Sequence, residues 1–405
     1  MQTQGPVEAR SLKRTLYATT ALCALTVIGG KAAHADGIEL GISGFMNTLF
    51  SAGGINATAG RDPVDGGAPD PKPDYNPTGL FADGEVWFLG DYKHDNGMRF
   101  GARVEMEVFS SSTSEDTISQ HFIFVQSDYG RVEAGSRYSA AYQMHYAAPQ
   151  VGLPINSGWV TVFIPANPDS TVAFVTPSVS TFIDYGDKEN QLTYYTPRIG
   201  GFQLGLSYAP SISFSGDGKN FPVEADRDTE YSNGFSVGLN YVEEFDGLGV
   251  ALSGGYRRSE APEAVTAAGG DDYQGVSLGA ELAYAGVTIG GSYANSFDGQ
   301  ATVDGGVLIN STEGQAWDVG VAYSSGPWVI GAAYLQTEVE GAPGGTAGFV
   351  GSGNEDKLYA ATAGIDYELG PGINAIGGVM YGRWSAESGA VNTGVIGAAG
   401  LTLSF

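Results

Sequence analysis

The stretch GVIGAAGLTLSF, residues 394–405, is the clearest indication of the fold, because its large apolar side chains recur at every second position. Successive side chains of a β-strand point to opposite faces, so this stretch predicts a strand with one apolar face and one small or polar face. Val395, Leu401, Leu403 and Phe405 lie on the apolar face, and Ile396 is the one large apolar residue on the other. End segments are usually frayed and polar. This one is predicted to be held in a sheet.

The first 35 residues predict an export signal. Arg10, Lys13 and Arg14 precede the apolar run LYATTALCALTVIGG, and small residues flank His34 before a cleavage point at Asp36. The apolar run is too short for a membrane-spanning helix. The expected organisation is therefore a signal peptide over residues 1–35 and one exported domain over residues 36–405.

The exported domain is strongly acidic and contains no cysteine. The single cysteine of the chain, Cys23, lies in the predicted signal, so no disulfide is available. Without residues 1–35 the chain has 15 basic against 44 acidic residues, a formal charge of −29. Phosphates attract basic surfaces, so nucleic acid is not an expected partner. Cations and basic partners fit this charge better.

From Tyr231 onward the sequence repeats a unit of two strands, each ending in tyrosine, with a tight turn between them and a long polar loop after them. The period of about 40 residues also occurs in β-propellers, but a propeller blade needs four short strands. Paired strands of about eleven residues, with short turns at one end and long loops at the other, are typical of transmembrane barrels. Tyrosine suits the boundary between lipid and water. The two rows are Tyr241, Tyr284, Tyr323 and Tyr367, and Tyr256, Tyr293, Tyr334 and Tyr381.

The same pattern extends backwards and predicts an all-β fold, a transmembrane antiparallel up-and-down β-barrel of sixteen strands. Sheet edges are intolerable in hydrocarbon, so the last strand must pair with the first. A barrel of this width leaves a water channel, because side chains cannot fill it. The expected strands are 38–51, 80–92, 98–110, 118–127, 131–138, 190–199, 202–210, 231–243, 248–258, 273–284, 287–297, 314–324, 328–338, 357–368, 373–384 and 393–405.

Two stretches, NQLTYYTPRIGGFQLGLSYAP (190–210) and YGRVEAGSRYSAAYQMHYAAP (129–149), resemble general porins of the alphaproteobacterial type. The likeness covers nearly all of the exported domain and agrees with the strand number and with Phe405. It implies a homotrimer in the outer membrane of a Gram-negative bacterium, surrounded by lipid and lipopolysaccharide, that lets small hydrophilic solutes and ions diffuse passively. It also implies that the barrel-assembly machinery reads Phe405, and that a third external loop folds inward to narrow the pore.

Residues 139–189 form the one loop of about fifty residues, and a loop of that length in a compact body is expected to be functional or disordered. The loop follows the fifth strand, where the resemblance places the inward loop. Its apolar stretches WVTVFIP and VAFVTPSVSTF argue against disorder. The alternative to inward folding is a lid packed over the mouth of the barrel.

The resemblance implies basic wall residues set against loop carboxylates at the constriction. Strand alternation turns Arg99, Arg103 and Glu105 toward the lumen on the third strand, and Arg137 shares one face of the fifth strand with Arg131 and Glu133. We expect Arg103 and Arg137 to lie farther from the short-turn rim than Arg99 does, and to form the basic wall. For each residue the alternative is a solvated position without a special role. The candidate loop acids are Asp169, Asp184, Asp187 and Glu189.

Catalysis is not expected. GFSVG (234–238) and GVSLG (275–279) fit the pattern of a hydrolase nucleophile elbow, but both lie inside predicted strands, and the elbow needs a strand, a turn and a helix. The histidines show no metal-ligand spacing. The acidic stretch EADRDTE (224–230) could hold Ca²⁺ loosely, although a solvated outer face explains the same residues. No other cofactor is expected.

Two functions other than a general diffusion channel are left open. In the first, the long loop plugs the pore and the barrel is a surface structure for adhesion. In the second, the channel is selective for one kind of solute, which would need a ladder of basic or aromatic residues along the lumen. The arginines of the sequence are few and scattered, and do not suggest such a ladder.

Overall fold

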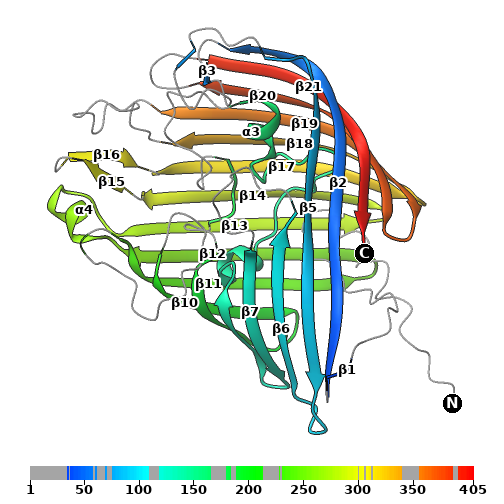
Figure 1. Ribbon diagram of the computed structural model, residues 1–405, viewed down its shortest axis with the longest axis vertical. Coiled ribbons are helices and arrows are strands. Elements are labelled where there is room, and N and C mark those ends of the chain that lie inside the picture. The colour runs from blue at the N-terminus through cyan, green and yellow to red at the C-terminus, as the bar shows by residue number, and fades with distance from the viewer. Residues whose placement is uncertain are drawn as a thin grey trace.

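The computed structural model describes residues 34–35, 37–57, 60–61, 69–70, 75–108, 118–165, 179–183, 188–212, 228, 230–299, 301–304, 307–311, 313–339, 355–385 and 391–405. Within these residues the chain is a closed antiparallel β-barrel of sixteen strands (Figure 1). The barrel strands are β2 (Ile38–Ala57), β5 (Thr78–Lys93), β6 (Arg99–Glu107), β7 (Ile118–Ser127), β8 (Gly130–Ser136), β9 (Asn190–Tyr195), β10 (Phe202–Ser211), β11 (Ser232–Phe245), β12 (Leu248–Glu260), β13 (Tyr273–Tyr284), β14 (Val287–Asp298), β17 (Gly314–Ser325), β18 (Trp328–Val339), β19 (Asp356–Gly370), β20 (Ile373–Ser385) and β21 (Val391–Ser404).

The last strand closes the barrel against the first, as the alternation in residues 394–405 predicts. The β2–β21 ladder runs from the pair Phe45–Ser404 to the pair Ala57–Asn392. Next to the pair Phe45–Ser404, the Phe405 N–H donates to the Gly44 carbonyl (3.1 Å), and the Gly44 N–H donates to the Phe405 carbonyl (2.8 Å). Every barrel strand therefore has a partner on both sides, which removes the unpaired edges that lipid cannot satisfy.

Short turns join the strands at one end of the barrel and long loops at the other. Two of the turns are two-residue hairpins with positive φ at both positions, at Asp246–Gly247 (49° and 85°) and Ala285–Gly286 (49° and 85°). This backbone matches the twist of the flanking strands, and glycine at the second position adopts it without strain. The predicted turns at 94–97, 128–130 and 200–201 also join strand pairs.

The outer face of the barrel is apolar, as the alternation predicts. Val395, Leu401, Leu403 and Phe405 are between 43% and 50% exposed, in keeping with side chains that face lipid. The two tyrosine rows lie on this face. At the short-turn end the tyrosine row also pairs with aromatic residues of neighbouring strands, as Tyr367 does with Trp328, whose ring centroid lies 4.2 Å away. The pattern of the two rows is that of aromatic girdles at the two membrane interfaces.

Smaller elements lie at the long-loop end. β3 (Gly60–Arg61) pairs with β4 (Pro69–Asp70), and β15 (Ala301–Asp304) pairs with β16 (Val307–Ser311). The helix α4 (Glu263–Ala267) lies beside β15 (Figure 1), and its Val265 packs in a buried cluster with Tyr231 and Tyr273. No helix among the described residues is long and apolar enough to cross a membrane.

The predicted export signal lies outside the described residues except for His34–Ala35, which form the two-residue strand β1 against β2. The stretch 224–230, considered for Ca²⁺, lies outside them except for Asp228 and Glu230. The two elbow-like pentapeptides lie inside β11 and β13. The strand continues after each serine, where a nucleophile elbow would need a turn and a helix.

Candidate functional site

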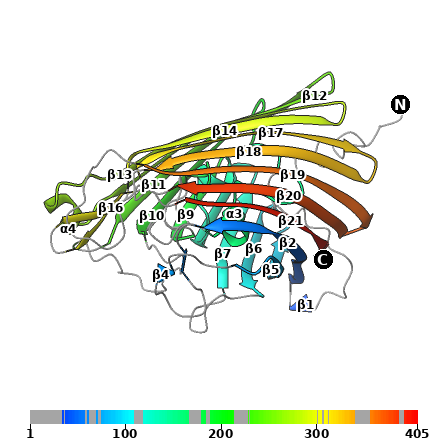
Figure 2. The ribbon, with the colours of Figure 1, turned by 90° about the horizontal axis from the view of Figure 1, so that it is seen from above.

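The described residues of the long segment between β8 and β9 pack against the inner face of the barrel. They include the helices α2 (Ala140–Gln143) and α3 (Trp159–Phe163), and Figure 2 shows α3 between the barrel walls. Val160 and Ile164 are fully buried in a cluster with side chains of β2 and β18 to β21. Ile396, the exception in the alternation of the last strand, belongs to this cluster, so its inward apolar side chain is explained by the loop that covers it.

Five inward side chains of the barrel accept hydrogen bonds from backbone N–H groups of the loop. A buried loop backbone needs such partners, because each unpaired amide costs the free energy of a lost hydrogen bond. The donors lie along residues 140–152 and the acceptors lie on β10, β11, β12, β17 and β19. The pairs are Ala140 N with Ser207 Oγ (2.9 Å), Ala141 N with Ser236 Oγ (3.0 Å), Tyr146 N with Ser253 Oγ (2.9 Å), Ala148 N with Asp318 Oδ2 (3.0 Å) and Gly152 N with Asp366 Oδ1 (3.1 Å).

A buried polar cluster ties the two limbs of the loop together on the wall. Asn156 of the first limb donates from Nδ2 to Asp318 Oδ2 (2.8 Å) and to Thr181 Oγ1 of the second limb (2.7 Å). The Thr181 N–H donates back to Asn156 Oδ1 (2.9 Å), and the Ser292 hydroxyl of β14 donates to Asp318 Oδ1 (2.5 Å). His145 covers the cluster with Nε2 at 3.4 Å from Thr181 Oγ1. The network fixes residues 145–156 and 179–183 as one unit.

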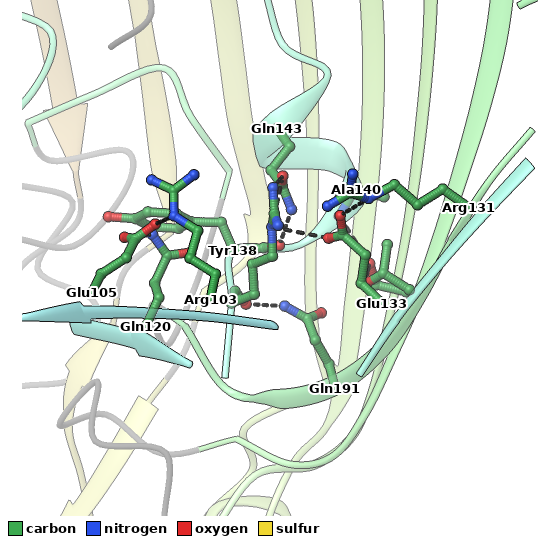
Figure 3. A network of polar contacts seen from close by, with 12 residues as sticks. Arg103, Glu105, Gln120, Arg131, Glu133, Tyr138, Ala140, Gln143 and Gln191 are labelled. Atoms are coloured by element: carbon green, nitrogen blue, oxygen red, sulfur yellow. Dashed lines mark hydrogen bonds and ion pairs between the residues drawn. The ribbon is translucent and has the colours of Figure 1, made fainter. Parts of the chain in front are cut away.

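The wall of β6 to β8 carries three arginines that are paired with glutamates (Figure 3). Arg103 Nε lies 2.5 Å from Glu105 Oε1. Glu133 is shared, since its Oε1 lies 2.5 Å from Arg131 Nε and its Oε2 lies 2.9 Å from Arg137 Nε. The carboxylates are 5% and 3% exposed, and the guanidinium side chains 16% to 30% exposed. The arginines therefore cover the carboxylates and present the positive charge to the lumen.

Each of these arginines also stacks on an aromatic ring of a neighbouring strand. The guanidinium carbon of Arg103 lies 4.4 Å from the Trp87 ring centroid, that of Arg131 lies 3.9 Å from Phe124, and that of Arg137 lies 4.0 Å from Phe122. The ring contacts and the ion pairing together hold the guanidinium groups close to the wall. These rings are not among the residues predicted from the sequence. The inward parity of Trp87, Phe122 and Phe124 on their strands was the available signal.

The structure places the predicted site residues in different surroundings. Arg103 and Glu105 lie together on β6, while Arg99 lies at the short-turn end of β6, 49% exposed and paired with Asp91 (2.7 Å). Glu189 is buried and lies with its Oε1 3.2 Å from Arg257 Nη2 of β12. Asp169, Asp184 and Asp187 lie outside the described residues.

Arg137 has a second contact that the sequence does not reveal. Its Nε and Nη2 both donate to Gln143 Oε1 (3.0 and 2.6 Å), and Gln143 Nε2 donates to the Tyr138 carbonyl (2.6 Å). Gln191 Nε2 donates to the Arg137 carbonyl (Figure 3). Arg137 therefore joins the wall carboxylate Glu133 to the first turn of the loop, at α2.

Acid pH is expected to loosen the loop through His145. Burial lowers the pKa of His145 from 6.5 to about 3, so the packed ring is neutral and the exposed ring takes a proton below about pH 6.5. Opening of the loop then becomes easier by about 1.4 kcal/mol for each pH unit below that value. Single-channel records or hydrogen exchange of the loop amides should show more opening at pH 5 than at pH 7.

The matched control for this effect is His145→Gln, which keeps a polar side chain but does not titrate in this range. Asp318 is the carboxylate that faces the histidine through Thr181 and Ser292, and it is present in both proteins. The difference between pH 7 and pH 5 should be lost in the variant. An equal difference in both proteins would assign the effect to the carboxylates.

Comparisons with known proteins point to one family. The family described as Gram-negative porin matches residues 18–386. An uncharacterised protein of Rickettsia typhi is 22% identical over 331 residues, 67% of this chain and 71% of that protein. A protein of Rickettsia bellii is 26% identical over 136 residues, 30% of this chain and only 31% of its own length.

Solved structures agree on the barrel. Salmonella typhi OmpF, determined in complex with daunomycin, has a TM-score of 0.60 at 14% identity and covers 92% of this chain and 100% of that chain. A porin refined at 1.8 Å has a TM-score of 0.55 at 16% identity, with 91% of this chain and 100% of that chain covered. At such low identity these likenesses establish the fold.

Proposed function

Because the chain belongs to the Gram-negative porin family, we propose that it forms a water-filled channel in the outer membrane, through which small hydrophilic solutes and ions diffuse passively. The observation that carries the proposal is the family match over residues 18–386 on a closed barrel with an apolar outer face and a charged inner wall. We assign no enzymatic activity to the barrel. The long loop, packed on the inner wall, would narrow the channel without spanning it.

The proposed surroundings follow from the same family. The protein is exported through the periplasm and assembles as a homotrimer among outer-membrane lipid and lipopolysaccharide. Phe405, whose backbone completes the β2–β21 ladder, would be the residue that the barrel-assembly machinery reads. These proposals rest on the family and on the closure of the barrel rather than on any bound partner.

We further propose that Arg103 and Arg137 form the positive side of the constriction. Their guanidinium groups are held against the wall by stacking and by Glu105 and Glu133. Since each positive charge has a carboxylate beneath it, the field across the lumen is weaker than unpaired arginines would give. With a formal charge of −29 on residues 36–405, mild preference for cations is the expected net result.

Single-channel conductance of the refolded protein in a planar bilayer tests the channel. Stepwise openings of nanosiemens size in groups of three, nearly linear in salt concentration, are expected from an open trimeric channel. The reversal potential in a salt gradient then gives the sign of selectivity. Silent insertion of a protein whose barrel is folded by gel mobility would contradict the channel and support a plugged surface structure.

A further inference from the structure

A line of glycines crosses the inner wall under the long loop. Gly205, Gly238 and Gly255 pair directly across β10, β11 and β12, and Gly331, Gly364 and Gly378 pair directly across β18, β19 and β20. Between the two groups, Gly279 lies on β13, and Gly290 and Gly320 pair across β14 and β17. Each barrel strand from β10 to β20 therefore contributes one inward glycine to the line.

The loop follows these glycines in the order of its own sequence. A Cβ atom on Gly238 would lie 2.5 Å from the Ala140 carbonyl, and one on Gly255 would lie 3.1 Å from Ala141 Cβ. Cβ atoms on Gly279 and Gly364 would overlap the carbonyl oxygens of Tyr146 and Val151. Real Cβ atoms are essentially never found within 3.0 Å of backbone atoms, so Gly238, Gly279 and Gly364 admit no side chain while the loop is in place, and a side chain at Gly255 would be crowded. Close approach of two backbones is the reason for glycine here, since φ is positive at none of these positions.

The hydrogen-bond acceptors of the loop lie two residues from the glycines on the same strands. Residues two apart on a strand share a face, so each such pair offers a gap for the loop backbone and an acceptor for its N–H. The pentapeptide GFSVG, which resembles a nucleophile elbow, thus supplies Ser236 and Gly238 to the loop instead. The pairs are Gly205 with Ser207, Ser236 with Gly238, Ser253 with Gly255, Asp318 with Gly320, and Gly364 with Asp366.

We propose that this glycine track, the line from Gly205 to Gly378, positions the constriction loop and thereby sets the bore of the channel. The inference deepens the proposed channel function and rests on it for the effect on conductance. A side chain added to the track would push residues 140–153 off the wall and into the lumen. The same side chain on the lipid face of a neighbouring strand would leave the loop where it is.

The test uses the full chain with Ala148→Cys as a reporter. Ala148 is 0% exposed on the wall, and the chain has no other cysteine beyond Cys23 of the predicted signal. Gly364→Val is the track variant. Gly377→Val is the matched control, because a Cβ there has its nearest neighbours at 3.5 Å and the residue lies beside Val379 on the outer face. Two quantities are measured on the folded protein: the rate at which the reporter cysteine reacts with a water-soluble maleimide, and the single-channel conductance.

The proposal expects the labelling rate to rise at least tenfold and the conductance to fall by half or more in Gly364→Val, with neither changed in Gly377→Val. Unchanged labelling and conductance in a folded Gly364→Val would overturn it. Faster labelling of channels that are silent in every variant, the parent included, would instead contradict the channel function and leave the track standing.

A second pair of variants, with smaller side-chain changes, keeps the test decisive if Gly364→Val does not fold. A Cβ on Gly331 would lie 2.6 Å from Val151 Cγ2, so Gly331→Ala should displace the loop slightly, and Val151→Ala should make room for it. The double variant is expected to bring labelling back to within twofold of the parent. Faster labelling in Gly331→Ala that Val151→Ala does not reverse, or no change in Gly331→Ala, would count against the track.

Discussion

A chain without residues 391–405 is expected to give no membrane-inserted barrel. β21 pairs with β2 from Phe45–Ser404 to Ala57–Asn392 and with β20 from Ile373–Leu403 to Ser385–Val391. Its removal leaves the backbone N–H and C=O groups on one side of both neighbours without partners in hydrocarbon, where each unsatisfied group costs several kcal/mol. The fifteen remaining strands could close only in a different register, with their apolar and polar faces no longer matched.

Gel mobility of unheated samples after refolding into detergent or lipid measures this effect. Full-length protein should migrate as a compact barrel that shifts on heating, and the truncated chain should not. Phe405→Ala is the matched control, since it keeps β21 and removes one ring. It should refold in vitro, while its assembly in cells should drop if the aromatic ring is read during insertion. A compact, heat-modifiable band from the truncated chain would contradict the role of β21 in closure.

The sixteen strands could be predicted from the sequence because two local signals coincide, alternation along each strand and turn residues between strands. The predictions 118–127 and 273–284 agree with β7 and β13 at both ends. The first strand was predicted to end at Ser51, but β2 continues to Ala57. Residues 52–57 read AGGINA, with Ile55 as the one large apolar side chain, so no alternation of large side chains marks the continuation.

The candidate site could be predicted only in part, because its contacts depend on register between strands and on the path of the loop. Parity placed Arg103 and Glu105 on the inner face. The stacking of Arg103 on Trp87 joins β6 to β5, and the bond from Arg137 to Gln143 joins the wall to α2. On this one patch of wall three arginines stack on three rings, and the expectation that no such ladder runs along the whole lumen stays a prediction. The inward glycines likewise could not be interpreted from the sequence. Glycine weakens a strand, and its reason at these positions is the loop that packs on them.

Opposite shifts in ion selectivity are expected from Arg103→Gln and Glu105→Gln. The two side chains form one ion pair, so the two substitutions change the charge of the same patch of wall by one unit in opposite directions. A unit charge about 7 Å from the ion path contributes about 0.6 kcal/mol in water. It favours one sign of ion and disfavours the other, so the cation-to-anion permeability ratio should rise several-fold in Arg103→Gln and fall several-fold in Glu105→Gln. Both effects should shrink at 1 M salt, where the screening length is about 3 Å.

Reversal potentials in a salt gradient measure the ratio, and two further variants separate charge from structure. Arg99→Gln removes the same charge at the short-turn end of β6, where the side chain is 49% exposed and paired with Asp91, and it should change the ratio little. Arg137→Lys keeps the positive charge but cannot donate twice to Gln143, so it should preserve the ratio while increasing current noise from the loop. Equal ratios in Arg103→Gln, Glu105→Gln and the parent would mean that ions pass too far from this wall to sense it, and the constriction would have to be sought along another part of the lumen.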